Sequence, residues 1–318
     1  MSSPPLARIG PPPVEDEQLR ELAGRRVHPV RRPGRWVIAA VVVVLLAQLV
    51  HALVTNPVFQ WDVFGYWFFR PVILDGLVLT LELTGLAAVF GLAGGIVLAL
   101  LRLSRNPLLQ AVSWVYVWIF RSIPLIVLLL FLANVTALYS TLSLGIPFGP
   151  SFVHFSATDL LSFFVVAVLG LSLNEAAYAA EVVRSGVLSV DQGQLEAAAA
   201  LGLPRWRQYR RIILPQATRA IVPAYANQLI GLLKGTSVVY ITSLLELFGV
   251  VETQASTNSG QIIPLLLVGT VWYVILTSVL SVVQYYVERY FSRGALRTVP
   301  PTPLQRVRAR LRTFGVVR

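Results

Sequence analysis

Long apolar runs dominate the chain, and short polar or basic segments separate them. A helix that crosses roughly 30 Å of hydrocarbon needs about 20 mostly apolar residues. Six runs meet this requirement, and we place them at Trp36–Val54, Asp75–Arg102, Pro107–Ala137, Leu160–Val183, Pro223–Phe248 and Ile262–Val287. The pattern predicts an all-α fold, a polytopic membrane bundle of six transmembrane helices.

Arginine side chains mark one side of this bundle. Nearly all of them lie in the two terminal segments and in the even-numbered connections, whereas Arg70 lies in an odd-numbered connection and Arg121 inside a run. Loops rich in positive charge stay in the cytoplasm. We therefore predict that both termini and the segment 184–222 are cytoplasmic. The imbalance also favours an even number of spans, because one missed helix divides the arginines between the two sides.

The composition is that of a membrane protein. Hydrophobic residues make up 56% of the 318 positions and charged residues 13%, whereas soluble domains carry about 25% charged residues. The net charge of +11 suggests nucleic acid in a soluble protein, but here it follows from the charged loops. Cysteine is absent, and His28, His51 and His154 have no metal-ligand spacing, so we predict no disulfide and no metal site.

The terminal segments differ from the spans. Residues 1–35 combine prolines, an acidic patch and arginines, which predicts a disordered cytoplasmic segment, and residues 294–318 form a basic tail. We expect both segments to contact anionic lipids rather than nucleic acid, because they flank membrane spans. The first apolar run follows a long polar lead and lacks an A-x-A site, so we interpret it as a retained helix and not as a cleaved signal peptide.

Small residues recur at helical spacing in the second run. Ala87, Gly91, Gly95 and Ala99 are four residues apart, so they share one face of a helix. A face without bulk lets a second helix approach closely. We predict that this face packs inside the bundle and binds no ligand.

The connection 184–222 is too long for a simple turn. Its alanine-rich stretch from Glu196 favours a helix that ends at Gly202, and Pro204 suits the start of a second helix. In that second helix Trp206, Tyr209 and Ile213 share one face. Prolines 215 and 223 are expected to interrupt the helix and redirect the chain into the fifth span. From the residues alone, a surface hairpin without a partner and a projection that docks into another protein remain equally open.

The spacing of this segment matches a known signature. Glu196, Ala197 and Ala198, then Gly202, then Ile212, Leu214 and Pro215 reproduce the pattern EAA-x3-G-x9-I-x-LP. In this the chain resembles the permease subunits of bacterial ATP-binding-cassette (ABC) importers. Further matching pieces resemble the polar amino acid branch, the histidine, glutamate and glutamine type: TLELT at 80–84, RSIPL at 121–125, AYAAE at 177–181, RSG at 184–186, GQ at 193–194, NQ at 227–228 and LKGTS at 233–237.

The resemblance covers about residues 70–293 and leaves 36–54 as an additional N-terminal membrane helix. It implies the type I importer permease fold, with residues 196–202 as a cytoplasmic coupling helix and corner, and with Ile212, Leu214 and Pro215 setting the return path. A β-carbon is expected to obstruct the bend at Gly202. The implied function is ATP-driven import of polar amino acids across the bacterial plasma (inner) membrane.

The resemblance also implies partners. Two copies of an ABC ATPase subunit bind ATP and Mg²⁺, so this chain binds no cofactor directly. A second permease copy or a paralogue and an extracytoplasmic solute-binding protein complete the importer. Where relatives usually have aspartate this chain has Gly235, and it has unexpected acidic residues at Glu82 and Glu175. These departures leave the cargo open, including an opine or another small nitrogen compound.

Ionisable and amide side chains inside the spans are candidates for lining the substrate path, because such groups are costly in a membrane. These candidates are Glu82, Arg121, Asn174, Glu175, Asn227 and Lys234. Pairing inside the bundle satisfies the same energetic demand, so a structural role remains open for each. Glu181 and Glu246 lie near predicted span ends, where we expect them to form pairs or to extend toward water.

No catalytic apparatus is recognisable. The only lysine, Lys234, follows a leucine, so the chain lacks the GK[ST] of a phosphate-binding loop, and it has no G-x-S-x-G motif. We predict a transport subunit and not an enzyme. Two alternatives remain open: an ion-coupled secondary transporter, which needs no long cytoplasmic loop, and a membrane scaffold that transports nothing.

Overall fold

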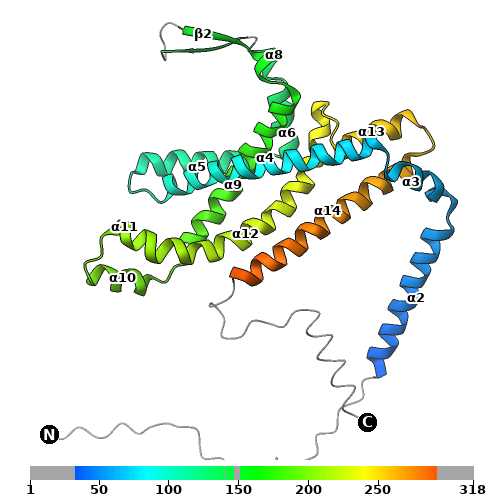
Figure 1. The fold of residues 1–318 in the computed structure, drawn as a ribbon, viewed down its shortest axis with the longest axis horizontal. Coiled ribbons are helices and arrows are strands. Elements are labelled where there is room, and N and C mark those ends of the chain that lie inside the picture. The colour runs from blue at the N-terminus through cyan, green and yellow to red at the C-terminus, as the bar shows by residue number, and fades with distance from the viewer. Residues whose placement is uncertain (1–32, 140, 147–150, 292–318) are drawn as a thin grey trace, which may run out of the picture. The chain divides into compact units, whose positions relative to one another are not determined.

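The computed structural model describes residues 33–139, 141–146 and 151–291 (Figure 1). The predictions for the N-terminal segment up to residue 32 and for the tail 294–318 lie outside these residues. The chain divides into two units, the first ending at Pro57 and the second beginning at Val58. In the first unit α2 (Pro33–Thr55) is apolar on all sides, and its side chains from Trp36 onward are exposed. A helix of this kind is typical of a membrane span.

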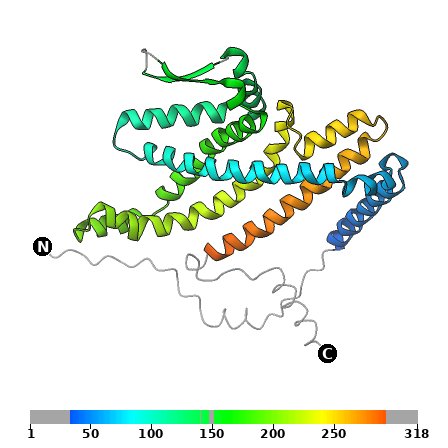
Figure 2. The same cartoon turned by 45° about the horizontal axis from the view of Figure 1, so that its top comes forward.

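The second unit is a helical bundle with one β-hairpin (Figures 1 and 2). A short turn of 3-10 helix, η1 (Pro57–Phe59), leads into it. Its elements are α3 (Trp61–Phe68), α4 (Pro71–Arg102), α5 (Pro107–Ser122), α6 (Leu125–Ala133), α7 (Val135–Leu138), β1 (Thr141–Gly145), β2 (Ser151–Ser156), α8 (Ala157–Leu160), α9 (Phe163–Leu188), α10 (Gln192–Ala200), α11 (Arg205–Gln208), η2 (Tyr209–Ile213), α12 (Leu214–Gly235), η3 (Thr236–Thr242), α13 (Leu247–Thr257) and α14 (Ile262–Phe291).

Four helices of the described chain, α2, α4, α9 and α14, are each long and apolar enough to cross a membrane. Two further spans arise if a bent helix pair counts as one span: α5 with α6, bent by 99°, and residues 205–242 with α13, bent by 47°. The all-α bundle predicted from the sequence is confirmed, with up to six spans.

The third predicted span is not a continuous helix. It breaks between α5 and α6, where Ile123 has an extended backbone and Pro124 follows it. Proline disfavours the helical conformation of the preceding residue and lacks the N–H that continues a helix. The uninterrupted run Pro107–Ala137 was therefore wrong in detail, because hydropathy does not register a backbone break.

The small-residue face of α4 packs against α9, as predicted. Ala87 and Ala99 are almost completely buried, and so are Gly91 and Gly95 between them. A β-carbon on Gly95 would lie 2.5 Å from Cβ of Ala179, well inside van der Waals contact. The two backbones approach this closely only because the side chains are missing.

Two hydrophobic clusters hold the other elements around this pair. Leu83 of α4, Leu129 of α6 and Val239 of η3 belong to a cluster that also includes side chains of α9 and α12. Leu247 of α13 and Leu265 of α14 belong to a second cluster at the beginning of α4. Side chains of both bent spans are therefore buried in clusters with residues of α4, and this packing holds the two spans in the bundle.

Glu246 lies in the break before α13 and is completely buried. Its carboxylate accepts hydrogen bonds from the backbone N–H groups of Phe248 (3.0 Å) and Gly249 (2.9 Å) and from the hydroxyl of Tyr273 (3.0 Å). The hydroxyl of Thr80 lies 3.2 Å from the same carboxylate. The expected pairing or extension toward water was wrong, because Glu246 caps a helix inside the bundle.

The segment before α8 and α9 folds into an antiparallel β-hairpin. Thr141 pairs with Ser156 and Ser143 with His154. The side chains of Phe152, Val153 and Phe155 are exposed. The hairpin is a local addition to a helical fold.

Candidate functional site

The segment between α9 and α12, which we call the elbow (residues 189–215), begins with the predicted short helix. The side chain of Asp191 caps α10 by accepting a hydrogen bond from the N–H of Gln194 (3.1 Å). At the other end, the N–H of Leu203 donates to the carbonyl of Ala198 (3.0 Å) and that of Gly202 to Ala199 (2.9 Å). This pair of bonds is the Schellman arrangement, which closes a helix with a left-handed residue.

Gly202 is that left-handed residue, with a φ of +68°. A β-carbon there would meet no atom within 4 Å. The expected obstruction therefore comes from the backbone conformation, which L-residues other than asparagine and aspartate rarely adopt, and not from crowding.

The second arm of the elbow continues without interruption into α12. The arm turns through α11 and the π-helical η2, in which the N–H of Leu214 donates to the carbonyl of Tyr209. Pro215 then lies in the first turn of α12, where no intrahelical donor is needed, and Pro223 lies inside α12. The expected interruptions at these two prolines were wrong. The π turn shifts the hydrogen-bond register ahead of Pro215, and α12 continues through Pro223.

The elbow is tied to the bundle by packing and by one side-chain bond. Val190, Ile213 and Ala217 form a small buried cluster at its base. The amide of Gln216 donates to the side-chain oxygen of Gln194 at 2.6 Å, which links α12 to α10. The elbow is therefore joined to α12 by packing and by a side-chain hydrogen bond as well as by the chain itself.

The signature residues divide into exposed and packed positions. Glu196 and Ala197 are exposed, and so are Leu214 and Pro215, whereas Ala198 is buried and Ile212 is half-buried. The packed positions shape the elbow, and the exposed ones are available to a partner.

Two large apolar side chains at the corner were not among the predicted site residues. Leu201 is 80% exposed and Trp206 is 71% exposed. The sequence placed Trp206 on one face with Tyr209 and Ile213, but of these only Ile213 is buried. The signal in the sequence is their position, because Leu201 directly precedes the corner glycine and Trp206 follows it by four residues.

A cavity of about 1020 Å³ lies beside the elbow and continues along α12. The elbow contributes Gln194, Arg211 and Pro215 to its wall, α12 contributes Asn227, and α14 contributes Glu288. One of the predicted path residues, Asn227, therefore shares a polar cavity with the elbow.

The exposed side of α12 is a stripe of small and polar residues. Ala220, Ala224, Asn227, Gly231 and Lys234 are all exposed and follow one another at spacings of three or four. Lys234 lines a second cavity of about 380 Å³, to which α14 contributes Tyr273 and Thr277. The stripe connects the walls of the two cavities along one helix face.

Comparison with known proteins identifies the family and the fold of the chain. Residues 91–294 match the family model described as binding-protein-dependent transport system inner membrane component. The arginine transport system permease protein ArgU of Corynebacterium glutamicum is 43% identical over 273 residues, which cover 85% of this chain and 84% of that protein. The glutamate/aspartate import permease protein GltK of Escherichia coli is 37% identical over 219 residues, 69% of this chain and 93% of that protein.

A solved structure, described as the crystal structure of an amino acid ABC transporter with histidines, is also similar. Its TM-score is 0.59 at 30% sequence identity, covering 69% of this chain and 94% of that chain. The chain belongs to the ABC importer permeases. Within them it falls in the polar amino acid branch, and as a permease subunit it is not itself the ATPase.

In this permease the remaining candidate path residues do not form one site. Glu82 is exposed on α4, and Glu175 of α9 is 2% exposed and lies against Gly91. The Oε1 atom of Glu175 has no hydrogen-bond partner in the described part of the chain. Asn174 donates to the carbonyl of Phe120 at 3.1 Å, just before the break that ends α5.

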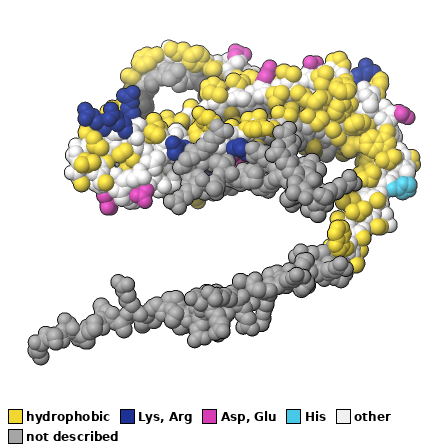
Figure 3. Space-filling model, turned by 60° about the horizontal axis from the view of Figure 1, so that its bottom comes forward, with side chains coloured by type: hydrophobic (Ala, Val, Ile, Leu, Met, Phe, Trp, Pro, Cys, Tyr) yellow, Lys and Arg dark blue, Asp and Glu magenta, His cyan; other side chains and the backbone are white. Residues whose placement is uncertain are grey.

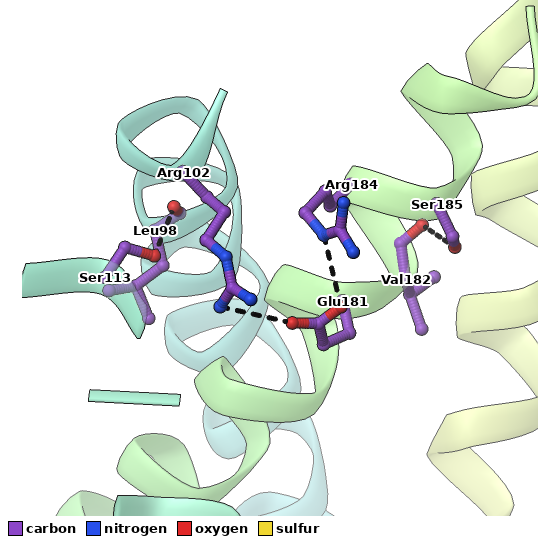
Figure 4. Close-up of polar contacts among 7 residues, drawn as sticks. All are labelled: Leu98, Arg102, Ser113, Glu181, Val182, Arg184 and Ser185. Atoms are coloured by element: carbon purple, nitrogen blue, oxygen red, sulfur yellow. Dashed lines mark hydrogen bonds and ion pairs between the residues drawn. The ribbon is translucent and has the colours of Figure 1, made fainter. Parts of the chain in front are cut away.

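Ion pairs occupy the ends of α4 and α9 (Figure 4). The carboxylate of Glu181 lies 3.5 Å from Arg102 and 3.3 Å from Arg184. The expected pairing of Glu181 is confirmed. The guanidinium of Arg121 lies over the ring of Tyr178, 5.3 Å from its centroid.

Proposed function

We propose that this permease carries a polar amino acid into a bacterial cell and that ATPase subunits drive it by gripping the elbow. The observation that supports the proposal is the form of the elbow, a capped helix and glycine corner that present Glu196 and Ala197 outward. The names of ArgU and GltK, which state arginine and glutamate/aspartate transport, support the class of cargo.

The proposed motor consists of two ATPase copies, which bind ATP and Mg²⁺. Glu196 and Ala197 contact the ATPase, and Leu201 and Trp206 add apolar contact area at the corner. Because Gln216 and the buried cluster fasten the elbow to α12, a push on the elbow displaces the helix that carries the polar stripe. The permease thereby alternates between inward-facing and outward-facing states.

The surface of the isolated chain supports the presence of a neighbouring permease, either a second copy or a paralogue. Glu82 is exposed in the middle of α4, and a charged side chain facing lipid at that depth is costly. A neighbouring permease or a water-filled path removes this cost. We propose that Glu82, Asn227 and Lys234 line a path between two permeases, which an extracytoplasmic solute-binding protein supplies with cargo.

The location follows the distribution of arginine. We propose that the permease spans the bacterial plasma membrane with both termini and the elbow in the cytoplasm, because positive loops remain inside. The transport unit then comprises residues 70–293, with 184–222 as its coupling segment, and residues 36–54 add one helix. We assign contact with anionic lipids to the basic segments at the termini.

Uptake by the reconstituted complex tests the proposal. The complex of permease, ATPase and binding protein is placed in vesicles, and uptake of labelled arginine and glutamate is measured with and without ATP. We expect ATP-dependent uptake of one of them that Glu196→Lys abolishes while assembly in the membrane persists. Glu252→Lys is the matched control, because Glu252 is an exposed glutamate on α13, far along the chain from the elbow.

Other outcomes identify the alternatives. Uptake that an ion gradient sustains without the ATPase supports a secondary transporter. ATP-dependent uptake of an opine, with no uptake of either amino acid, supports the ATPase-driven mechanism and identifies an opine as the cargo. Full activity of Glu196→Lys contradicts the role of the elbow.

A further inference from the structure

A small cavity between the ends of α4, α5 and α9 concentrates positive charge. The cavity has a volume of about 220 Å³, and Arg102, Arg121 and Glu181 contribute to its wall. Glu181 is paired with Arg102 and also with Arg184 (Figure 4). Arg121 has no ion pair among the described residues, and its guanidinium lies over the ring of Tyr178. The two arginines and one carboxylate of the cavity wall leave a net positive charge, and Arg184 offsets part of the same carboxylate from outside the wall. This excess of positive charge favours an anion.

The same cavity opens beside an aromatic and apolar surface. Trp114 and Trp118 of α5 line it, and their rings are parallel with centroids 6.1 Å apart. Both indoles are more than half exposed, and Leu108, Val112 and Val115 are exposed on the same helix. Tryptophan is enriched where a membrane protein meets the lipid headgroups, because its ring is apolar and its N–H is polar.

The two features together select an amphiphile. A soluble anion gains from the arginines but nothing from the indoles and the aliphatic side chains of α5. A neutral lipid gains from the apolar surface but does not balance the excess charge. A phospholipid with an anionic headgroup satisfies both, since its phosphate fits between guanidinium groups and its acyl chains lie along the helix.

We propose that this cavity is a binding site for the phosphate of an anionic membrane phospholipid. Arg121 and Arg102 bind the phosphate, and Trp114 and Trp118 pack against the glycerol and the first part of the acyl chains. Glu181 pairs with Arg102 from the other side and offsets part of the positive charge. In the proposed orientation, the end of α4 that carries Arg102 faces the inner leaflet, so the lipid comes from that leaflet. This site is distinct from the basic terminal segments.

Native mass spectrometry of the intact importer complex tests the site. The complex is purified and exposed to a mixture of phosphatidylglycerol and phosphatidylcholine, and the lipids retained per permease are counted. We expect Arg121→Gln to weaken retention of one phosphatidylglycerol about fivefold, as expected for one near-surface cation. Arg105→Gln is the matched control, because Arg105 is an exposed arginine just after α4 that does not line the cavity.

A second variant has an effect of the opposite sign. Glu181→Gln removes the only carboxylate of the cavity wall, so it should strengthen retention of phosphatidylglycerol, which loss of structure would not do. Equal retention by Arg121→Gln and Arg105→Gln overturns the site. Equal retention of phosphatidylcholine overturns the headgroup charge as its determinant. Displacement of the lipid by excess inorganic phosphate shows a soluble-anion site and overturns the lipid as its ligand.

Discussion

At the scale of single residues, glycines in this permease are required for two different physical reasons. Gly202 has open space around its α-carbon but a positive φ, whereas Gly91 and Gly95 have ordinary helical backbones and no space. The left-handed conformation costs an L-residue roughly 1–2 kcal/mol. Overlap with a neighbouring backbone has a cost that depends on how far the helices can separate.

The positive φ of Gly202 predicts that different substitutions impair transport to different degrees. Gly202→Val should abolish ATP-coupled uptake, because a β-branched residue opposes the left-handed corner that orients the elbow. Gly202→Asn should retain most of the uptake, since asparagine tolerates that conformation. Uptake and substrate-stimulated ATPase activity of the reconstituted complex measure the difference. Normal coupling in Gly202→Val counts against the corner.

Glu246 is the other residue for which one substitution gives a clear prediction, because its carboxylate caps α13 inside the bundle. Glu246→Gln should lower the free energy of unfolding by about 1–3 kcal/mol, because an amide NH2 group then faces buried donors that had a carboxylate acceptor. Thermal unfolding in detergent is the measurement. Glu252→Gln on the exposed side of α13 is the control and should leave the midpoint unchanged. An equal midpoint for both variants contradicts the capping role of Glu246.

At the scale of elements, close approach of two helices determines how the bundle is assembled. The faces of α4 and α9 fit because Gly91 and Gly95 accept the side chains of Glu175 and Ala179. Elsewhere, breaks define the elements: Pro124 separates α5 from α6, and Glu246 caps α13 after a turn. The bends are stable because buried side chains next to each break, Leu129 after the first and Val239 and Leu247 around the second, belong to clusters that include residues of α4.

The contact between α4 and α9 gives a prediction with an internal control. Gly95→Ala should destabilise the permease by about 1–3 kcal/mol, because its β-carbon overlaps the backbone of Ala179 and forces the helices apart. Gly85→Ala on the same helix should be neutral or slightly stabilising, since nothing lies within 4 Å of its β-carbon. Unfolding midpoints of the two purified variants decide the point. A similar loss in both would mean that helix flexibility, and not packing, is responsible.

At the scale of the whole molecule, the surface is that of a chain surrounded by lipid and by partners. Figure 3 shows broad apolar areas in which charged side chains are few and gathered into small groups. The two bent spans and the four straight helices give up to six crossings. An even number of crossings places the two ends of the chain on the same side of the membrane.

Single cysteines can test the proposed orientation, because the natural chain has none. Ser143→Cys in the hairpin should react with a membrane-impermeant thiol reagent in intact cells. Ala200→Cys in the elbow should react only after the membrane is permeabilised. Both side chains are exposed, and the proposed orientation places them on opposite sides of the membrane. Labelling of Ala200→Cys in intact cells would reverse the orientation and remove the elbow from the reach of an ATPase.

Sequence reasoning reached the features that local chemistry specifies. The lengths of the apolar runs predict the spans, a stripe of small residues predicts that the second run packs closely inside the bundle, and Gly202 after an alanine-rich helix predicts the corner. The positions of Pro215 and Pro223 were misread, because the effect of a proline depends on the hydrogen-bond register ahead of it. Of the candidate path residues, Asn227 and Lys234 share a helix face, whereas Glu82, Arg121 and Glu175 lie elsewhere.

The sequence by itself therefore determined the number and order of the apolar runs, the elbow and the membrane class of this permease, because each depends on residues that are close along the chain. Only the tertiary structure decided which ionisable groups are buried and what they contact. Glu246 meets Thr80 and Tyr273, and Arg102 meets Glu181. These partners come from different helices, and no pattern within one helix specifies which side chain of another helix it will meet.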